Sequence, residues 1–118
     1  MIRPPGRYRR AYKLFRLRAD GTIGPLFINR HQVIPLGEWL PAKPHPTKGY
    51  QFRPYWHVAP APFAPHLSLK NRIWMRVEIV NYHRFPRPHI QGGAWLLANW
   101  LRVLGPVKSG VDNQRNLR

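Results

Sequence analysis

The chain has 118 residues, which is the size of one domain, and 43% of them are hydrophobic, so it can bury a core of its own. It carries twenty Lys and Arg residues against four acidic residues, and its net charge of +16 predicts a polyanionic partner. Cysteine is absent, which excludes disulfides, thiolate metal sites and a cysteine nucleophile. No apolar run reaches the roughly 18 residues that span a bilayer, so we predict no membrane span and a cytoplasmic location.

The first forty residues predict a basic arm followed by short strands. Residues 1–11 hold four arginines around a Pro-Pro-Gly sequence, which favours an extended and flexible backbone. Residues 12–18 alternate in polarity like a strand, and the Asp20–Gly21 pair after them predicts a turn. Residues 24–29 indicate a second short strand. Residues 33–40 indicate a bulged or edge strand, or a buried loop, because a proline and a glycine interrupt them.

The middle of the chain predicts a stiff loop and then one clear strand. Residues 41–66 contain seven prolines, and proline restricts φ and lacks a backbone donor, so we predict a long ordered loop. Residues 72–82 alternate and predict a strand. Its apolar face consists of Ile73, Met75, Val77 and Ile79. Residues 83–93 predict a basic loop.

The last apolar segment, residues 94–105, fits two structures. A helix would align Leu96, Leu97, Trp100, Leu101 and Leu104 along one stripe. A strand would place Trp95, Leu97, Asn99, Leu101 and Val103 on one face. The chain as a whole predicts one α+β, mainly β, domain over residues 12–105, with a basic arm (residues 1–11) and a basic tail (residues 106–118).

Motifs of catalysis and metal binding are missing from the sequence. No two of the six histidines have the i, i+4 spacing of a helical zinc site, and there is no Walker loop or GxGxxG sequence. Neither serine lies in a nucleophile elbow. We therefore predict no metal and no cofactor, although His57, His66 and His89 could still assemble in space. The residues favour a binding protein over an enzyme.

Basic and aromatic residues are interleaved in the proline-rich loop. Single-stranded nucleic acid is held by cations along its backbone and by aromatic rings under its bases. We predict phosphate contacts from Arg7, Arg9, Arg10, Lys48, Arg53, Arg84 and Arg87. We predict stacking faces from Tyr50, Tyr55 and Trp56. This mixture favours binding of nucleic acid, with RNA or a ribonucleoprotein as the preferred partner and without sequence-specific reading of base edges.

Four strings, DGTIGPLFINR, HPTKGYQFRPYWH, APHL and QGGAW, resemble a family of small phage and prophage proteins. The resemblance covers about three quarters of the chain. It implies a single compact domain and a location in the host cytoplasm, and it implies no particular activity. It adds one alternative partner, which is an acidic host protein or a host nuclease complex, since charge raises association rates with such surfaces.

The layout of the chain is also similar to small ADP-ribosyltransferase domains. The likeness rests on a first strand containing Arg16, a Gly-Tyr-x-Phe element at Tyr50, and a W-x-R-V-E-I strand. It implies that residues 94–105 form a strand, which we therefore favour. It also implies an NAD site lined by Arg16, Tyr50, His57 and Gln91. Gln91 stands where that fold has a catalytic glutamate, so the likeness implies either an enzyme or an inactive derivative that binds a nucleotide.

Overall fold

One antiparallel sheet dominates the structure, a computed structural model that describes residues 3–26, 31–42, 55–64, 67–88, 90 and 93–107. Its strands are β1 (Tyr8–Leu17), β2 (Ile23–Gly24), β3 (Leu40–Pro41), β4 (Trp56–Val58), β5 (Arg72–Phe85) and β6 (Trp95–Pro106). They are ordered β2-β1-β5-β6-β3, and β4 also pairs with β6. The mainly β prediction is confirmed. The described residues contain no α-helix, so the helical part of the predicted α+β class is not found among them.

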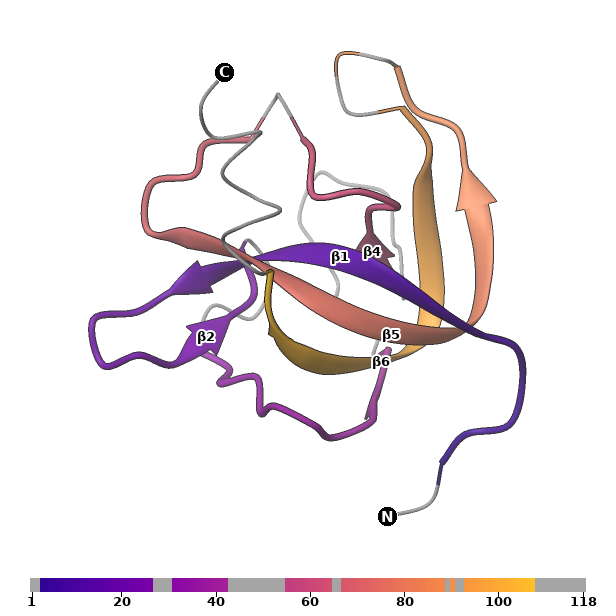
Figure 1. Ribbon diagram of the computed structural model, residues 1–118, viewed down its shortest axis with the longest axis horizontal. Coiled ribbons are helices and arrows are strands. Elements are labelled where there is room, and N and C mark those ends of the chain that lie inside the picture. The colour runs from indigo at the N-terminus through magenta and orange to yellow at the C-terminus, as the bar shows by residue number, and fades with distance from the viewer. Residues whose placement is uncertain are drawn as a thin grey trace.

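The sheet curls until its two sides are joined by short segments (Figure 1). Strand β4 pairs with β6, and Ala59 directly after it exchanges two backbone hydrogen bonds with Tyr12 of β1, of 2.9 and 2.7 Å. The loop between β2 and β3 also bonds to both sides. The Ile34 N–H donates to a carbonyl of β2, and the Gly37 N–H donates to a carbonyl of β6. The curled sheet therefore encloses one core.

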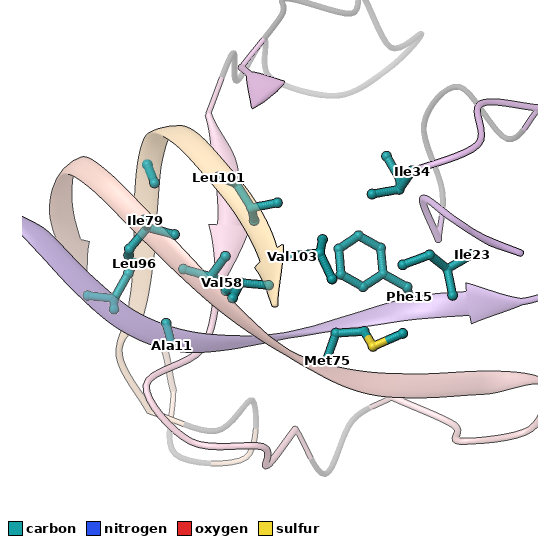
Figure 2. Packing of buried hydrophobic residues seen from close by; sticks show 12 residues of the cluster. Ala11, Phe15, Ile23, Ile34, Val58, Met75, Ile79, Leu96, Leu101 and Val103 are labelled. Carbon is teal, nitrogen blue, oxygen red and sulfur yellow. The ribbon is translucent and has the colours of Figure 1, made fainter. Parts of the chain in front are cut away.

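The core consists of apolar side chains from both long strands of the β5–β6 hairpin and from the segments that face it (Figure 2). Its members are Ala11, Phe15, Ile23, Ile34, Val58, Met75, Val77, Ile79, Leu96, Ala98, Leu101 and Val103. Each fully buried aliphatic or aromatic side chain stabilises the fold by about 1.5–3 kcal/mol. The apolar face predicted for residues 72–82 is confirmed, since three of its residues are buried and Ile73 packs against them.

Halfway along the β5–β6 hairpin, the face that points toward the core is exchanged for the opposite face. In β5 the core residues have odd numbers up to Ile79, and the next side chain packed against the core is Tyr82. Asn81 between them has φ +55°, a left-handed conformation that asparagine tolerates better than most residues. The register continues across it, with Val80 opposite Trp100 and Tyr82 opposite Ala98. The kink thus changes facing without inserting a residue.

In β6 the set of side chains that point toward the core also changes, opposite the kink in β5. The segment for which we favoured a strand over a helix, residues 94–105, is a strand from Trp95 onward. The predicted strand face is correct for Leu101 and Val103 and wrong for the first half of the strand. There Leu96 and Ala98 belong to the core cluster in place of Leu97 and Asn99.

Several predicted boundaries differ from the structure. Strand β1 begins at Tyr8 and pairs with β5 over residues 8–16, so the arm ends before residue 8 and the predicted boundary at residue 11 is wrong. Pairing with β5 orders these residues despite their charge. The strand expected at residues 24–29 is limited to β2 in the described region, and most of residues 33–40 form a loop that ends in β3.

The predicted loop over residues 41–66 is described only in part. Residues 43–54 and 65–66 lie outside the described residues. The remainder contains β4, a strand that local sequence did not predict. The tail also starts later than predicted, because β6 extends through Pro106, and residues 108–118 lie outside the described residues.

Residues 4–6 lie against the outer face of the sheet. Pro4 is buried, and its carbonyl accepts a hydrogen bond from the Tyr8 hydroxyl. The Asn81 side-chain amide donates to the Pro5 carbonyl over 3.3 Å. Gly6 between these contacts has φ +133°, and a Cβ atom there would lie 2.5 Å from Asn81 Oδ1. Glycine is therefore required for this close approach.

We expect Gly6→Ala to lower the free energy of unfolding by about 1–2 kcal/mol, because both the backbone conformation and the contact with Asn81 become unfavourable. Urea unfolding followed by tryptophan fluorescence measures this loss. Gly21→Ala is the matched control, since Gly21 has φ +87° and a Cβ atom added there would meet no other atom within 4 Å. A loss in Gly6→Ala no larger than that in Gly21→Ala would contradict the close packing of residues 4–6.

Candidate nucleic-acid interface

The start of β1 crosses the bend of β5 at one end of the sheet (Figure 1), and basic residues of these two segments form one set with Tyr82. We call this set the arginine rim. It comprises Arg7, Arg9, Asn81, Tyr82 and Arg84. The Arg9 guanidinium lies 5.9 Å from the centroid of the Tyr82 ring. Arg7, Asn81 and Tyr82 line an open hollow of about 300 Å³. Arg84 shares a strand face with Tyr82, because side chains two residues apart point the same way.

The kink at Asn81 is what creates the arginine rim. Before the kink, even-numbered side chains of β5 point to the outer face, as Glu78 does. After it, Tyr82 packs against the core. This change brings Tyr82 to the face of the sheet that also carries Arg9, whose neighbour two residues along β1 is the buried Ala11. The rim thus borders the core at one end of the curled sheet.

The positive charge of the arginine rim is not compensated within the described residues. Both ion pairs of that region involve Glu78, which lies 2.7 Å from Arg102 and 3.6 Å from Arg3. Asp20 instead accepts hydrogen bonds from the hydroxyl and the backbone N–H of Thr22, and these bonds lower the pKa of Asp20. Arg7, Arg9 and Arg84 are exposed and form no ion pair there. An exposed group of cations of this kind attracts anions.

More basic and aromatic side chains lie on the opposite face of the same hairpin. The Tyr55 ring meets His83 edge to face, with centroids 5.0 Å apart, and remains 37% exposed. The Arg87 guanidinium lies 5.6 Å from the centroid of Phe85. The structure thus places Tyr55 and Arg87 beside His83 and Phe85, on the face of the hairpin opposite the rim. Arg10 is exposed and pairs in register with Glu78 on the outer side of the sheet.

Trp56 was predicted to offer a stacking face, and its surroundings argue against that role. Its indole Nε1–H donates to the Leu40 carbonyl over 3.0 Å, and its ring packs against the core. The side chain is therefore used to hold β4 and β3 on the sheet. Local sequence could not reveal this, because the partners of Trp56 are distant in the chain.

The other predicted site residues are only partly described. Lys48, Tyr50, Arg53 and Gln91 lie outside the described residues. Of the two remaining positions of the predicted NAD site, Arg16 is half-buried and donates to the Leu26 carbonyl over 3.0 Å. His57 lies in β4. No group of three potential metal ligands occurs within the described ranges, and His66 and His89 fall outside them.

Lys13 has an environment that the sequence pattern did not reveal. Its neighbours Ala11 and Phe15 on the same strand face are core residues, so its side chain starts inside the curled sheet. The ammonium group donates to the His57 carbonyl over 2.7 Å and lies 5.9 Å from the ring centroid of Trp56. Burial lowers the pKa of Lys13 to about 8. A lysine in an alternating strand would otherwise be assigned to the solvent face.

The shifted pKa of Lys13 predicts a stability that depends on pH. Between pH 8 and 10.5 the unfolded chain keeps a proton on this amine that the folded chain has lost. The free energy of unfolding should therefore rise with pH in this window, by about 1–3 kcal/mol. Chemical unfolding at a series of pH values measures the rise. Lys13→Met should remove it and the exposed control Lys70→Met should retain it; a rise that survives in Lys13→Met would contradict the assignment.

Comparison of the chain with protein-family models, curated proteins and solved structures found no match. The resemblances to phage proteins and to ADP-ribosyltransferases therefore stay predictions from the sequence. Among the residues that the structure describes, none belongs to an apolar helix of membrane-spanning length.

Proposed function

We propose that the protein binds nucleic acid, with the arginine rim contacting backbone phosphates. The observation that carries this proposal is that Arg7, Arg9 and Arg84 are exposed and form no ion pair within the described part of the chain. Arg9 lies 5.9 Å from the Tyr82 ring centroid, and Arg7 lines the same hollow as Tyr82. The guanidinium fork matches the geometry of phosphate oxygens and donates two parallel hydrogen bonds to them. Arg10, on the outer side of the sheet, and Arg87, over the Phe85 ring, are further cations outside the rim.

RNA or a ribonucleoprotein is the partner that we favour. Contacts to phosphate set the position of a nucleic acid and carry no sequence information. Accessible aromatic rings are the usual means by which proteins hold unpaired RNA bases. Tyr55 is exposed and Tyr82 is half-buried. We therefore propose binding that depends weakly on sequence and strongly on the presence of phosphates.

Fluorescence anisotropy with a labelled single strand of RNA, and with DNA of the same sequence, tests the proposal across a salt series. Each phosphate contact contributes about 0.7 to the slope of log affinity against log salt for a single strand. The three arginines of the rim should therefore supply about two units of slope. Absence of binding at about 50 mM salt would overturn the proposal, because electrostatic binding is strongest at low salt.

Purification at low salt provides an independent observation. A bound nucleic acid would raise the ratio of absorbance at 260 nm to that at 280 nm, and nuclease treatment would lower the ratio again. A co-purifying protein that survives nuclease treatment would instead support an acidic protein as the partner, since the same uncompensated charge attracts acidic surfaces.

A further inference from the structure

We infer that Tyr82 stacks on one unpaired base, so that the arginine rim binds single strands in preference to duplexes. This inference rests on the proposed function and names the form of nucleic acid that the same site accepts. It also identifies the residue that discriminates between the two forms. The sequence pattern alone predicts stacking from other rings.

The open hollow beside Tyr82 offers groups that match parts of a nucleotide. Its volume of about 300 Å³ is at the lower limit of small-molecule sites in proteins. Tyr82 supplies an aromatic wall, Arg7 supplies a cation and Asn81 supplies a polar edge. A single nucleotide combines the matching groups, which are a flat ring and an adjoining phosphate.

The Tyr82 ring is also held in place and left accessible. The ring packs against the core, which restricts its motion, and the residue remains half-exposed. Arg9 is 5.9 Å from the ring centroid, close to the limit of about 6 Å for a cation–π contact. Tyr8 provides a contrast, because Arg3 covers its ring at 3.9 Å and Trp39 contacts it edge to face. Tyr82 is thus the better stacking surface of the two.

Stacking on Tyr82 requires a base with a free face. In a duplex, neighbouring base pairs cover both faces of every internal base, so a base must leave the stack before an aromatic side chain can contact it. A single strand exposes its bases at much lower cost. The phosphate contacts of the rim are available to both forms, and the contact with Tyr82 is available mainly to the single strand.

An abasic strand separates this inference from the proposed function, because it keeps the phosphates and lacks the bases. Anisotropy should show the ordinary strand binding about five- to 150-fold more tightly than an abasic strand of equal length. Tyr82→Leu, which keeps apolar packing against the core, should remove most of this difference, because the ordinary strand loses its stacking contact. Tyr82→Phe should retain the difference. Tyr12→Leu is the control, since Tyr12 lies outside the rim.

The possible outcomes are distinct. If the wild-type protein binds neither strand, the proposed function fails and the inference fails with it. If it binds both strands equally, or if Tyr82→Leu discriminates between them as the wild type does, the inference alone is overturned. Circular dichroism verifies that Tyr82→Leu folds. If Tyr82→Leu does not fold, equal affinity of the wild-type protein for the ordinary and the abasic strand would still contradict the inference.

Discussion

Replacing Arg7, Arg9 and Arg84 together with alanine is expected to weaken binding of a single strand by about ten- to 100-fold at low salt. Each exposed ion pair contributes up to about 1 kcal/mol, and three such contacts are lost. The slope of log affinity against log salt should fall by about two units, since each phosphate contact contributes about 0.7. Anisotropy titrations over the same salt series measure both quantities.

The matched control for this prediction is the loss of one positive charge elsewhere. Lys70 is exposed and directly precedes the turn into β5, at the opposite end of that strand from the rim. Lys70→Ala should weaken binding much less than Arg84→Ala, although both remove one charge. Equal effects would show that net charge, and not the arginine rim, governs binding. Thermal unfolding of each variant confirms that the fold is intact.

Glu78→Gln is expected to lower the free energy of unfolding by about 2 kcal/mol. The Glu78 side chain is 14% exposed and pairs with Arg102, which is 33% exposed, over 2.7 Å. Removing one partner of a buried ion pair costs about 3–5 kcal/mol, and the partial exposure of Arg102 reduces this cost. Arg102 Nε is buried and has no hydrogen-bond partner within the described region, so the guanidinium depends strongly on Glu78. Urea unfolding measures the loss.

Two further variants make the prediction specific. Glu38→Gln is the control, because Glu38 is exposed and forms no ion pair among the described residues. Its stability should change by less than about 0.5 kcal/mol. Glu78→Gln combined with Arg102→Met should lose less stability than the sum of the two single changes, since the double variant leaves no unpaired charge. Additive losses would contradict a direct pairing.

Glu78 also connects the fold to the candidate site. Its second oxygen lies 3.6 Å from Arg3, whose guanidinium covers the Tyr8 ring, and Tyr8 contacts Trp39. Arg102 lies 5.1 Å from the centroid of Trp39, which completes a ring of contacts on the outer face. These contacts hold residues 3–7 on the sheet. Loss of Glu78 should therefore displace Arg7 as well as destabilise the core.

Local sequence patterns predicted the strands whose side chains alternate. Residues 12–17 and 72–82 lie in β1 and β5, and the Asp20–Gly21 turn is present, with a hydrogen bond from the Gly21 N–H to the Arg18 carbonyl. The pattern could not predict that pairing with β5 extends β1 back to Tyr8. Charged residues such as Arg9 and Arg10 resemble a solvated arm until a partner strand lies beside them.

Local patterns could not predict which side chains of the β5–β6 hairpin point toward the core. A strict period of two assigns Tyr82 to the outer face, whereas beyond the left-handed Asn81 its ring packs against the core. Asparagine adopts the left-handed conformation mainly in loops and turns. A single asparagine within an alternating segment therefore does not predict a kink in a strand. Likewise Trp56 looks like a stacking surface in sequence, and only the closure of the curled sheet by β4 shows that it packs inward.

By itself, the sequence determined the excess of cations and the alternating segments that can form strands, because charge and local periodicity are properties of the chain before it folds. The tertiary structure decided which cations meet an acid and which do not. Strand register brings Glu78 to Arg102 across the sheet, while the kink at Asn81 places Tyr82 among arginines that have no such partner in the described part of the chain. Such contacts join residues far apart in the chain, so their pairing depends on register and closure, which short-range patterns do not encode.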